Sequence, residues 1–230
     1  MSDTTLREAP STSAELVAQK LREDIRTGAL RPAEKLQLRS LCERYGVSSS
    51  PIREALSRLT SEGLVTASGQ RGFWVAPASH DDLFDILQSR IVIEGAALRR
   101  SVALGGEAWE LDVLAALHRL KKHAQRCDYS MPWVDEWEIL HKAFHMSLIS
   151  GCGSRRMQEM SARLYDESER YRRLYWNYRL PKEELISEHQ ALVDIVLSRD
   201  AEPAVEAHIR HMDLTLELVA KLQTGTAVEK

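Results

Sequence analysis

Cysteine is scarce in this sequence of 230 residues, and long apolar runs are missing. The three cysteines, Cys42, Cys127 and Cys152, are widely spaced, and none belongs to a CxxC pair. This excludes a disulfide framework and favours a reducing compartment, so we expect a cytoplasmic protein. No run of about 18 apolar residues exists, so we expect no membrane span. The polar N-terminus, residues 1–10, predicts no secretory signal.

An excess of basic charge is missing as well. The chain has 31 Lys+Arg and 34 Asp+Glu, a net charge of −3, which excludes a uniformly basic coat for nucleic acid. Residues 1–78 nevertheless carry 11 basic and 9 acidic side chains, a net of +2, whereas residues 79–230 carry 20 and 25, a net of −5. Motifs such as HExxH and GxSxG are also absent, which argues against an enzyme.

Three segments of the first half have apolar residues at helical spacing, and each stops at a glycine. The third starts at Ser50 and Pro51, which suit the N-cap and the first helical position. About three to four residues separate the second helix from the third, which is the spacing of a helix-turn-helix. The segments are 14–27, with Leu16, Val17, Leu21 and Ile25 on its inner face, 38–45 and 50–61.

A β-hairpin is predicted directly after this motif. Residues 64–67 and 73–75 have the composition of strands, and the polar, glycine-containing stretch 68–72 between them supplies a turn. A hairpin in this position is a wing. The first half is therefore predicted to be a winged helix-turn-helix.

Small hydroxyls and arginines gather where the third helix would leave them exposed. The first N–H groups of a helix bind phosphate, and an arginine can bind a guanine edge or clamp a phosphate. A recognition helix contacts base edges with its N-terminal residues, while flanking residues contact the DNA backbone. Each arginine alone would be an ordinary surface residue, but together they predict contacts to double-stranded DNA from Arg39, Ser48, Ser49, Ser50, Arg53, Ser57 and Arg71.

The second half has apolar residues at helical spacing in six stretches that are broken by glycine or proline. Their short connections favour an antiparallel helical bundle. Pro77 prevents a helix from continuing out of the first half. The stretches are roughly 80–104, 107–128, 132–150, 154–178, 181–199 and 201–222. The fold is thus predicted to be mainly α, with a flexible start at 1–12, a DNA-binding domain at 13–76, a linker at 77–80, an effector-binding and dimerisation domain at 81–222 and a flexible end at 223–230.

Four histidines of the second half are predicted to point inward. His141 and His145 are four residues apart and share a helix face, while His189 and His211 have apolar neighbours at helical spacing on both sides. Neutral imidazole is a common ligand of zinc and nickel, although a single inward histidine is more often a hydrogen-bonded core residue than a ligand. The histidines without such a pattern are expected at the surface: His118, His123 and His208.

Residues 28–75 resemble the DNA-binding domain of GntR-family regulators. The shared pattern includes a Gly-x-Leu-x-Pro opening at 28–32 and a Gly-Val-Ser-x-x-Pro-x-Arg-Glu-Ala-Leu core at 46–56. The resemblance implies that Arg39 and Arg53 contact DNA. The chain departs from the family at Ser49, where an arginine is usual, and at Ala33, where a glycine is usual.

The second half resembles the FCD ligand-binding domain of the FadR subfamily of these regulators. This resemblance implies that His145, His189 and His211 hold a divalent metal, with His141 in a position usually filled by Asp or Asn. The segments that carry it are 141–154, 188–200 and 208–215.

The family's effectors are small organic acids. Arg90 matches a family arginine that lies four residues before a glutamate, here Glu94, and is expected to bind the effector carboxylate. An intrahelical pair between Arg90 and Glu94 is the alternative.

The predicted function is therefore a DNA-binding regulator, most simply a repressor, which binds a two-fold operator as a homodimer and responds to a small carboxylate, with a zinc or nickel ion beside it. Two alternatives remain at this stage. In the first the metal ion is itself the effector, and in the second the histidine cluster is the centre of a metal-dependent enzyme.

Overall fold

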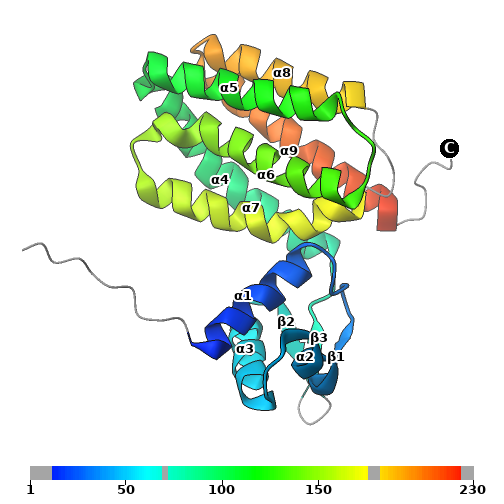
Figure 1. The fold of residues 1–230 in the computed structure, drawn as a ribbon. Helices are drawn as coiled ribbons and strands as arrows, with labels where there is room; N and C mark the ends of the chain where they lie inside the picture. Colours follow the sequence, from blue (N-terminus) through cyan, green and yellow to red (C-terminus); the bar gives the residue numbers. More distant parts are fainter. Residues whose placement is uncertain (1–11, 69–71, 176–181, 224–230) are drawn as a thin grey trace, which may run out of the picture. The chain divides into compact units, whose positions relative to one another are not determined.

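The computed structural model describes residues 12–68, 72–175 and 182–223 (Figure 1). The chain folds into two compact units, 1–77 and 78–230. None of the helices in the described part is long and apolar enough to cross a membrane.

The described part of the N-terminal unit contains three helices and a three-stranded antiparallel sheet. The strand order is β1-β3-β2, so that the predicted hairpin of β2 and β3 gains β1 as a third strand. This confirms the winged helix-turn-helix. The elements are α1 (Ser13–Arg26), β1 (Lys35–Leu36), α2 (Leu38–Tyr45), α3 (Ser49–Ser61), β2 (Val65–Ala67) and β3 (Phe73–Val75).

Strand β1 was not predicted, because two residues are too short to show an alternating pattern. Leu36 is buried and lies opposite Phe73 in the sheet, while Lys35 lies opposite Trp74. The ammonium of Lys35 is 5.6 Å from the centre of the Trp74 ring. The sheet therefore closes one side of the small core with apolar contacts.

Helix α1 is capped by Thr12, whose side-chain oxygen accepts a hydrogen bond from the backbone N–H of Glu15. Its inner face buries Val17, Leu21 and Ile25 against α3. The prediction that Leu16 also faces inward is wrong, because this side chain lies to one side of the buried stripe and is 48% exposed. The apolar face predicted from helical spacing alone is therefore wider than the face that is buried in the structure.

The turn between α2 and α3 depends on Gly46. This residue has φ 68° and ψ 33°, the left-handed conformation that glycine adopts without a steric penalty. Its N–H donates a hydrogen bond to the carbonyl of Cys42, and α2 ends at this turn. The chain can thus reverse and start α3 within a few residues, as helix-turn-helix spacing requires.

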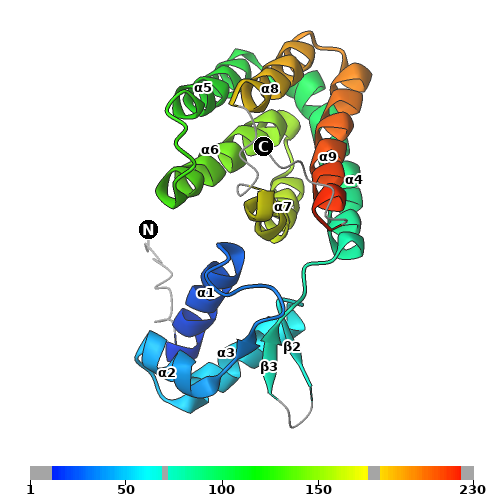
Figure 2. The same cartoon turned by 90° about the vertical axis from the view of Figure 1, so that its right-hand side faces the viewer.

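The described part of the C-terminal unit is entirely helical, which confirms the predicted helical domain. Consecutive pairs such as α5 and α6, or α8 and α9, pack against each other after short connections (Figure 2). The elements are α4 (His80–Leu104), α5 (Glu107–Ala124), α6 (Met131–Ile149), the short 3-10 helix η2 (Ser150–Cys152), α7 (Arg155–Tyr175), α8 (Lys182–Leu197) and α9 (Ala201–Gln223).

Helix α5 ends at Ala124, earlier than the predicted residue 128. The residues that follow form a turn in which the carboxylate of Asp128 accepts a hydrogen bond from the N–H of Ser130, 2.8 Å away. Ser130 in turn caps α6 by accepting from the N–H of Trp133. Local side-chain bonds thus hold the connection between α5 and α6, where the apolar spacing predicted a longer helix.

Helix α6 lies between its neighbours and positions the candidate site. It packs against α4, α5 and α7, and Figure 2 shows it between α5 and α7. Its buried face carries both apolar and polar side chains, so this helix brings titratable groups into the core. The buried side chains of α6 include Trp133, Trp137, Glu138, His141, Phe144 and His145.

Candidate nucleic-acid interface and metal centre

The N-terminus of α3 is the first candidate site. The helix starts at Ser49 with Ser48 in the N-cap position, rather than with Ser50 as the cap. Pro51 is therefore the third helical residue. This remains compatible with a helix, because N–H groups of the first turn have no intrahelical partner to lose. The Ser48 side chain makes no capping hydrogen bond, which leaves this helix end open to an external acceptor.

The predicted DNA-contacting residues that the structure describes are all exposed: Arg39, Ser48, Ser49, Ser50, Arg53 and Ser57. The small serines cover the first turn of α3, and buried Ile52, Ala55, Leu56 and Leu59 hold the opposite face of the helix in the core. Arg71 lies outside the described residues. The predicted contact between Arg71 in the wing and DNA therefore stays a prediction.

Arg53 differs from its neighbours in its partners. Arg39 is paired with Glu43 at 3.0 Å, and Arg58 is paired with Glu54 at 2.8 Å. The Arg53 guanidinium has no ion pair or hydrogen bond within the described residues. Since an exposed ion pair contributes little to stability, an unpaired arginine costs the fold nothing and is free to bind an external anion.

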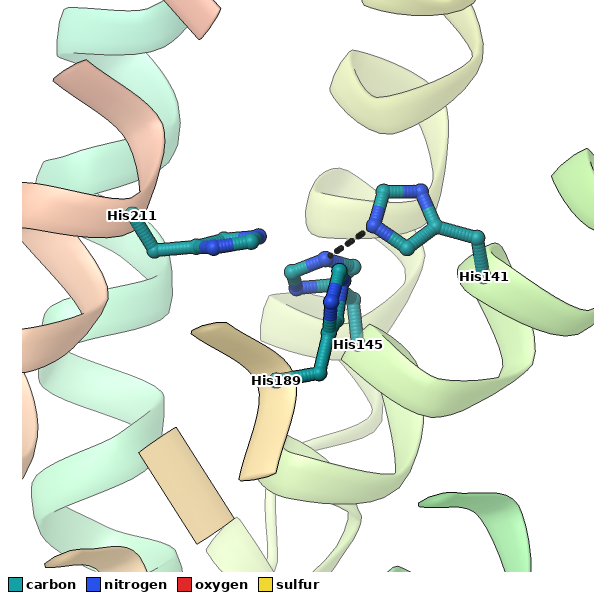
Figure 3. A group of neighbouring side chains, drawn as sticks. All are labelled: His141, His145, His189 and His211. Atoms are coloured by element: carbon teal, nitrogen blue, oxygen red, sulfur yellow. Dashed lines mark hydrogen bonds between the residues drawn. The ribbon is translucent and has the colours of Figure 1, made fainter. Parts of the chain in front are cut away.

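The four predicted inward histidines meet in the core of the C-terminal unit. Figure 3 shows His141 and His145 on α6, His189 on α8 and His211 on α9, with their rings directed toward one another. One ligand atom from each lies within 4.8 Å of the others. Three are buried and His211 is partly buried. The four histidines therefore converge, which the sequence alone could not establish.

Burial sets the protonation state of this cluster. It lowers the pKa of His141, His145 and His211 well below 6.5, and the neighbouring imidazoles and guanidiniums lower it further. These three rings are therefore neutral at pH 7 and have lone pairs to donate. The Nε2 atoms of His141 and His145 are 3.0 Å apart.

The donor set fits a divalent transition metal. Four imidazoles match the preference of zinc, nickel and similar ions for nitrogen ligands. The Nδ1 atoms of His145 and His211 are buried without a hydrogen-bond partner in the described part of the chain, which is costly unless something else satisfies them. The residues are therefore compatible with a bound ion.

Arg90, the predicted effector ligand, makes the intrahelical pair that was its alternative. Its guanidinium binds Glu94 through two hydrogen bonds of 2.8 and 3.2 Å, and both side chains are buried. Burial opposes ionisation of Glu94, but Arg90 and His208 overcome it and lower the pKa of Glu94 to about 2. The pair is therefore fully charged at neutral pH.

Two of the predicted surface histidines are buried instead. His208 is 1% exposed, and its Nε2 lies 2.8 Å from a carboxylate oxygen of Glu94. It follows Ala204 by four residues, a spacing that already placed it on the inner face of α9. His123 is 9% exposed, stacks on Trp133 and bonds its backbone carbonyl. The prediction holds only for His118, which is exposed.

A second buried arginine was not predicted. Arg172 binds Glu138 at 2.9 Å and the hydroxyl of Ser168 at 2.6 Å. Burial alone would lower the pKa of Arg172, but Glu138 raises it above the usual value. Arg90 also reaches Ser168, at 3.3 Å. Both guanidiniums lie against the ring of Tyr165, 4.8 and 4.0 Å from its centre.

The sequence indicated Arg172 only weakly. It lies in a run of arginines and tyrosines, 170–175, which fits a partly exposed helix as well as a buried one. Its acid partner Glu138 is 34 residues away on another helix, so no local pattern links the two.

Comparison with known families decides the assignment. Residues 13–75 match the family described as "Bacterial regulatory proteins, gntR family", and residues 85–214 match the FCD domain. The chain belongs to the GntR family of regulators. As a GntR regulator with an FCD domain, it is a DNA-binding transcriptional regulator, in agreement with the prediction that it is not an enzyme.

Relatives of this GntR regulator align over most of its length. It is 37% identical to the HTH-type transcriptional repressor GlaR of Escherichia coli (strain K12), over 89% of this chain and 94% of GlaR. It is 39% identical to the HTH-type transcriptional regulator BphR of Paraburkholderia xenovorans (strain LB400), over 89% of this chain and 84% of BphR.

Solved structures support the fold. The structure titled E. coli McbR/YncC superimposes with a TM-score of 0.71 at 19% identity, covering 92% of this chain and 99% of the other. A GntR family member from Pseudomonas syringae pv. tomato str. DC3000 gives a TM-score of 0.53 at 25% identity, covering 96% and 90%.

Proposed function

We propose that this GntR regulator is a repressor that binds a two-fold operator as a homodimer and releases it when a small organic acid binds in the FCD domain beside a divalent metal. The observation that carries this proposal is the convergence of four histidine side chains in the core of the FCD domain. The repressor assignment is supported by the relative GlaR, whose name describes a transcriptional repressor.

The DNA-binding half of the proposal rests on α3. Its N-terminal turn has exposed serines that let a backbone approach closely, and Arg53 is exposed with no acid partner among the described residues. A guanidinium in this position can bind a guanine edge through two hydrogen bonds. A homodimer would present two copies of α3, so we expect an operator with two equivalent half-sites.

The effector half rests on the groups around the histidines. His141, His145, His189 and His211 would hold the ion, and a zinc or nickel ion bound there would supply positive charge that attracts a carboxylate. Arg90 would bind the acid by exchanging part of its bond with Glu94 for one with the effector. The acid regulates DNA binding only if it has a higher affinity for one of two conformational states.

The test measures DNA affinity by fluorescence anisotropy, with a labelled duplex that the protein has selected from a random-sequence pool. Titrations are run with zinc present and with each member of a panel of small organic acids. We expect one acid class to weaken binding at least tenfold. Affinity that stays constant across the panel, or no preference for the selected duplex over scrambled DNA, would contradict the proposal.

A second candidate is a regulator for which the ion itself is the effector. It is favoured by Arg90, because this guanidinium already donates two hydrogen bonds to Glu94 and one to Ser168. In this case, chelation by EDTA alone would change DNA affinity, and zinc alone would restore it. Under the first proposal, EDTA changes chiefly the response to the acid.

A further inference from the structure

As a metal ligand, His141 must have its proton on a particular ring nitrogen, whereas an acidic ligand has no such requirement. An imidazole has two ring nitrogens, and in the neutral ring one of them carries a proton. A histidine can donate its Nε2 lone pair to an ion only when that proton is on Nδ1. A carboxylate at this position would need no such arrangement.

The proton of His141 has a defined neighbour. The Nδ1 atom lies 2.7 Å from the hydroxyl oxygen of Tyr165 on α7, while Nε2 faces His145 at 3.0 Å. If Nε2 donates to an ion, Nδ1 must be protonated, and the Tyr165 oxygen is then placed to accept its hydrogen bond. The same ring thus faces the histidine cluster with one nitrogen and the tyrosine with the other.

Tyr165 is held firmly in this position. Its side chain is 1% exposed, and the guanidiniums of Arg90 and Arg172 lie against its ring at 4.8 and 4.0 Å. The Nδ1 atoms of His145 and His211, in contrast, have no hydrogen-bond partner among the described residues. Support from a neighbouring hydroxyl therefore distinguishes His141 from His145 and His211.

We propose that Tyr165 is a positioning residue for the metal centre, which holds His141 with its proton on Nδ1 and its Nε2 lone pair directed into the histidine cluster. This inference rests on the metal site of the proposed function and adds the residue that makes a histidine usable at position 141. Hydrogen-bond partners of this kind fix the orientation of a histidine ligand and raise its basicity.

The experiment is a double-mutant cycle on the full chain, with zinc affinity measured by competition with a chromogenic chelator. Tyr165→Phe keeps the ring and its contacts with the arginines but removes the hydroxyl. We expect zinc affinity to fall about 10- to 100-fold, the usual effect of losing such a partner. In the His141→Ala background, the same substitution is expected to change zinc affinity by less than about twofold, because no Nδ1 remains to be oriented.

Tyr171→Phe is the matched control. Tyr171 is on the same helix and is fully buried, but its hydroxyl bonds Asp82 and Arg170 rather than a histidine. Its loss should leave zinc affinity unchanged. Long-range ¹H–¹⁵N spectra of the zinc-loaded protein provide a second measurement, since they identify which nitrogen of His141 carries the proton.

The outcomes separate the two levels of the argument. Wild-type zinc binding that Tyr165→Phe leaves within about twofold, or lowers equally in the His141→Ala background, overturns the role of Tyr165 while the metal site stands. Absence of zinc binding in the wild type and in every variant overturns the proposed metal site, and the role of Tyr165 with it.

Discussion

The two units place their functional groups in opposite environments. In the N-terminal unit the described candidate residues are exposed serines and arginines on α2 and α3, and the buried core beneath them is apolar. In the FCD domain the candidates are buried histidines, arginines and glutamates that also fill the core. DNA binding should therefore be separable from folding by mutation, whereas metal and effector binding should be coupled to it.

The largest expected effect is on folding of the FCD domain. Glu138→Ala leaves Arg172 buried without its acid partner, and breaking a buried pair in this way costs about 3–5 kcal/mol. Glu159→Ala removes the partner of exposed Arg155 and should cost less than about 1 kcal/mol. Urea unfolding measures both. Similar losses for the two variants would show that the contrast between buried and exposed pairs does not hold.

The next effect is on metal content. His189→Ala removes a direct ligand, and we expect zinc affinity to fall by more than about 100-fold, beyond the effect of losing a neighbouring support. His118→Ala alters an exposed histidine of the same domain and should leave zinc binding unchanged. Elemental analysis of the metal bound per subunit provides the measurement. Unchanged stoichiometry in His189→Ala would make His189 a core residue only.

Arg53→Ala tests the role of the exposed candidate residues of the N-terminal unit. Loss of a guanidinium that binds a base edge costs roughly 1–3 kcal/mol of operator binding for each half-site. The unfolding free energy should change by less than about 0.5 kcal/mol, because the side chain is exposed and unpaired in the described structure. Arg58→Ala, which removes an arginine already paired with Glu54, is the control. Equal operator affinity of Arg53→Ala and wild type would remove Arg53 from the recognition role.

The same contrast explains what could be predicted from the sequence. In the N-terminal unit, glycines, proline and apolar spacing determine the backbone locally, so the helix-turn-helix and its exposed face followed directly. The N-cap of α3 lies two residues before the predicted one, at Ser48 instead of Ser50, because a first-turn proline is tolerated at more than one position. Only β1, with two residues, gave no pattern.

The FCD domain was harder to predict because its polar contacts are long-range. Helical spacing correctly turned four histidines inward, but it could not show that they meet. The prediction also missed His208, although its spacing from Ala204 places it on the inner face of α9, and it missed the pair of Glu138 with Arg172. Buried charges are stable only with partners, and those partners lie on other helices. Local patterns therefore underestimate how polar this core is.

Lowering the pH tests the buried carboxylate of Glu94 in the FCD domain. The pKa of Glu94 is about 2 in the folded protein, below its ordinary value of 4.5. Its contribution to stability is therefore complete above about pH 4.5 and is lost as the pH falls toward 2, at up to about 1.4 kcal/mol per pH unit. Tryptophan fluorescence during urea unfolding reports this loss, since four of the five tryptophans lie in residues 78–230. Glu94→Gln should be less stable at neutral pH and should show a shallower pH dependence, and an unchanged slope would contradict the assignment.

The smallest expected effect concerns Ser49, at the exposed start of α3. Ser49→Arg adds a cation at the exposed start of α3 without touching the core, so folding should be unaffected. Each added phosphate contact steepens the salt dependence of DNA binding by about one unit of slope, and operator affinity at low salt should rise by up to about tenfold. Ser61→Arg adds the same charge at the other end of the helix and should leave the slope nearly unchanged. Equal slopes for the two variants would mean that net charge, rather than the position of the α3 N-terminus, governs contact with DNA.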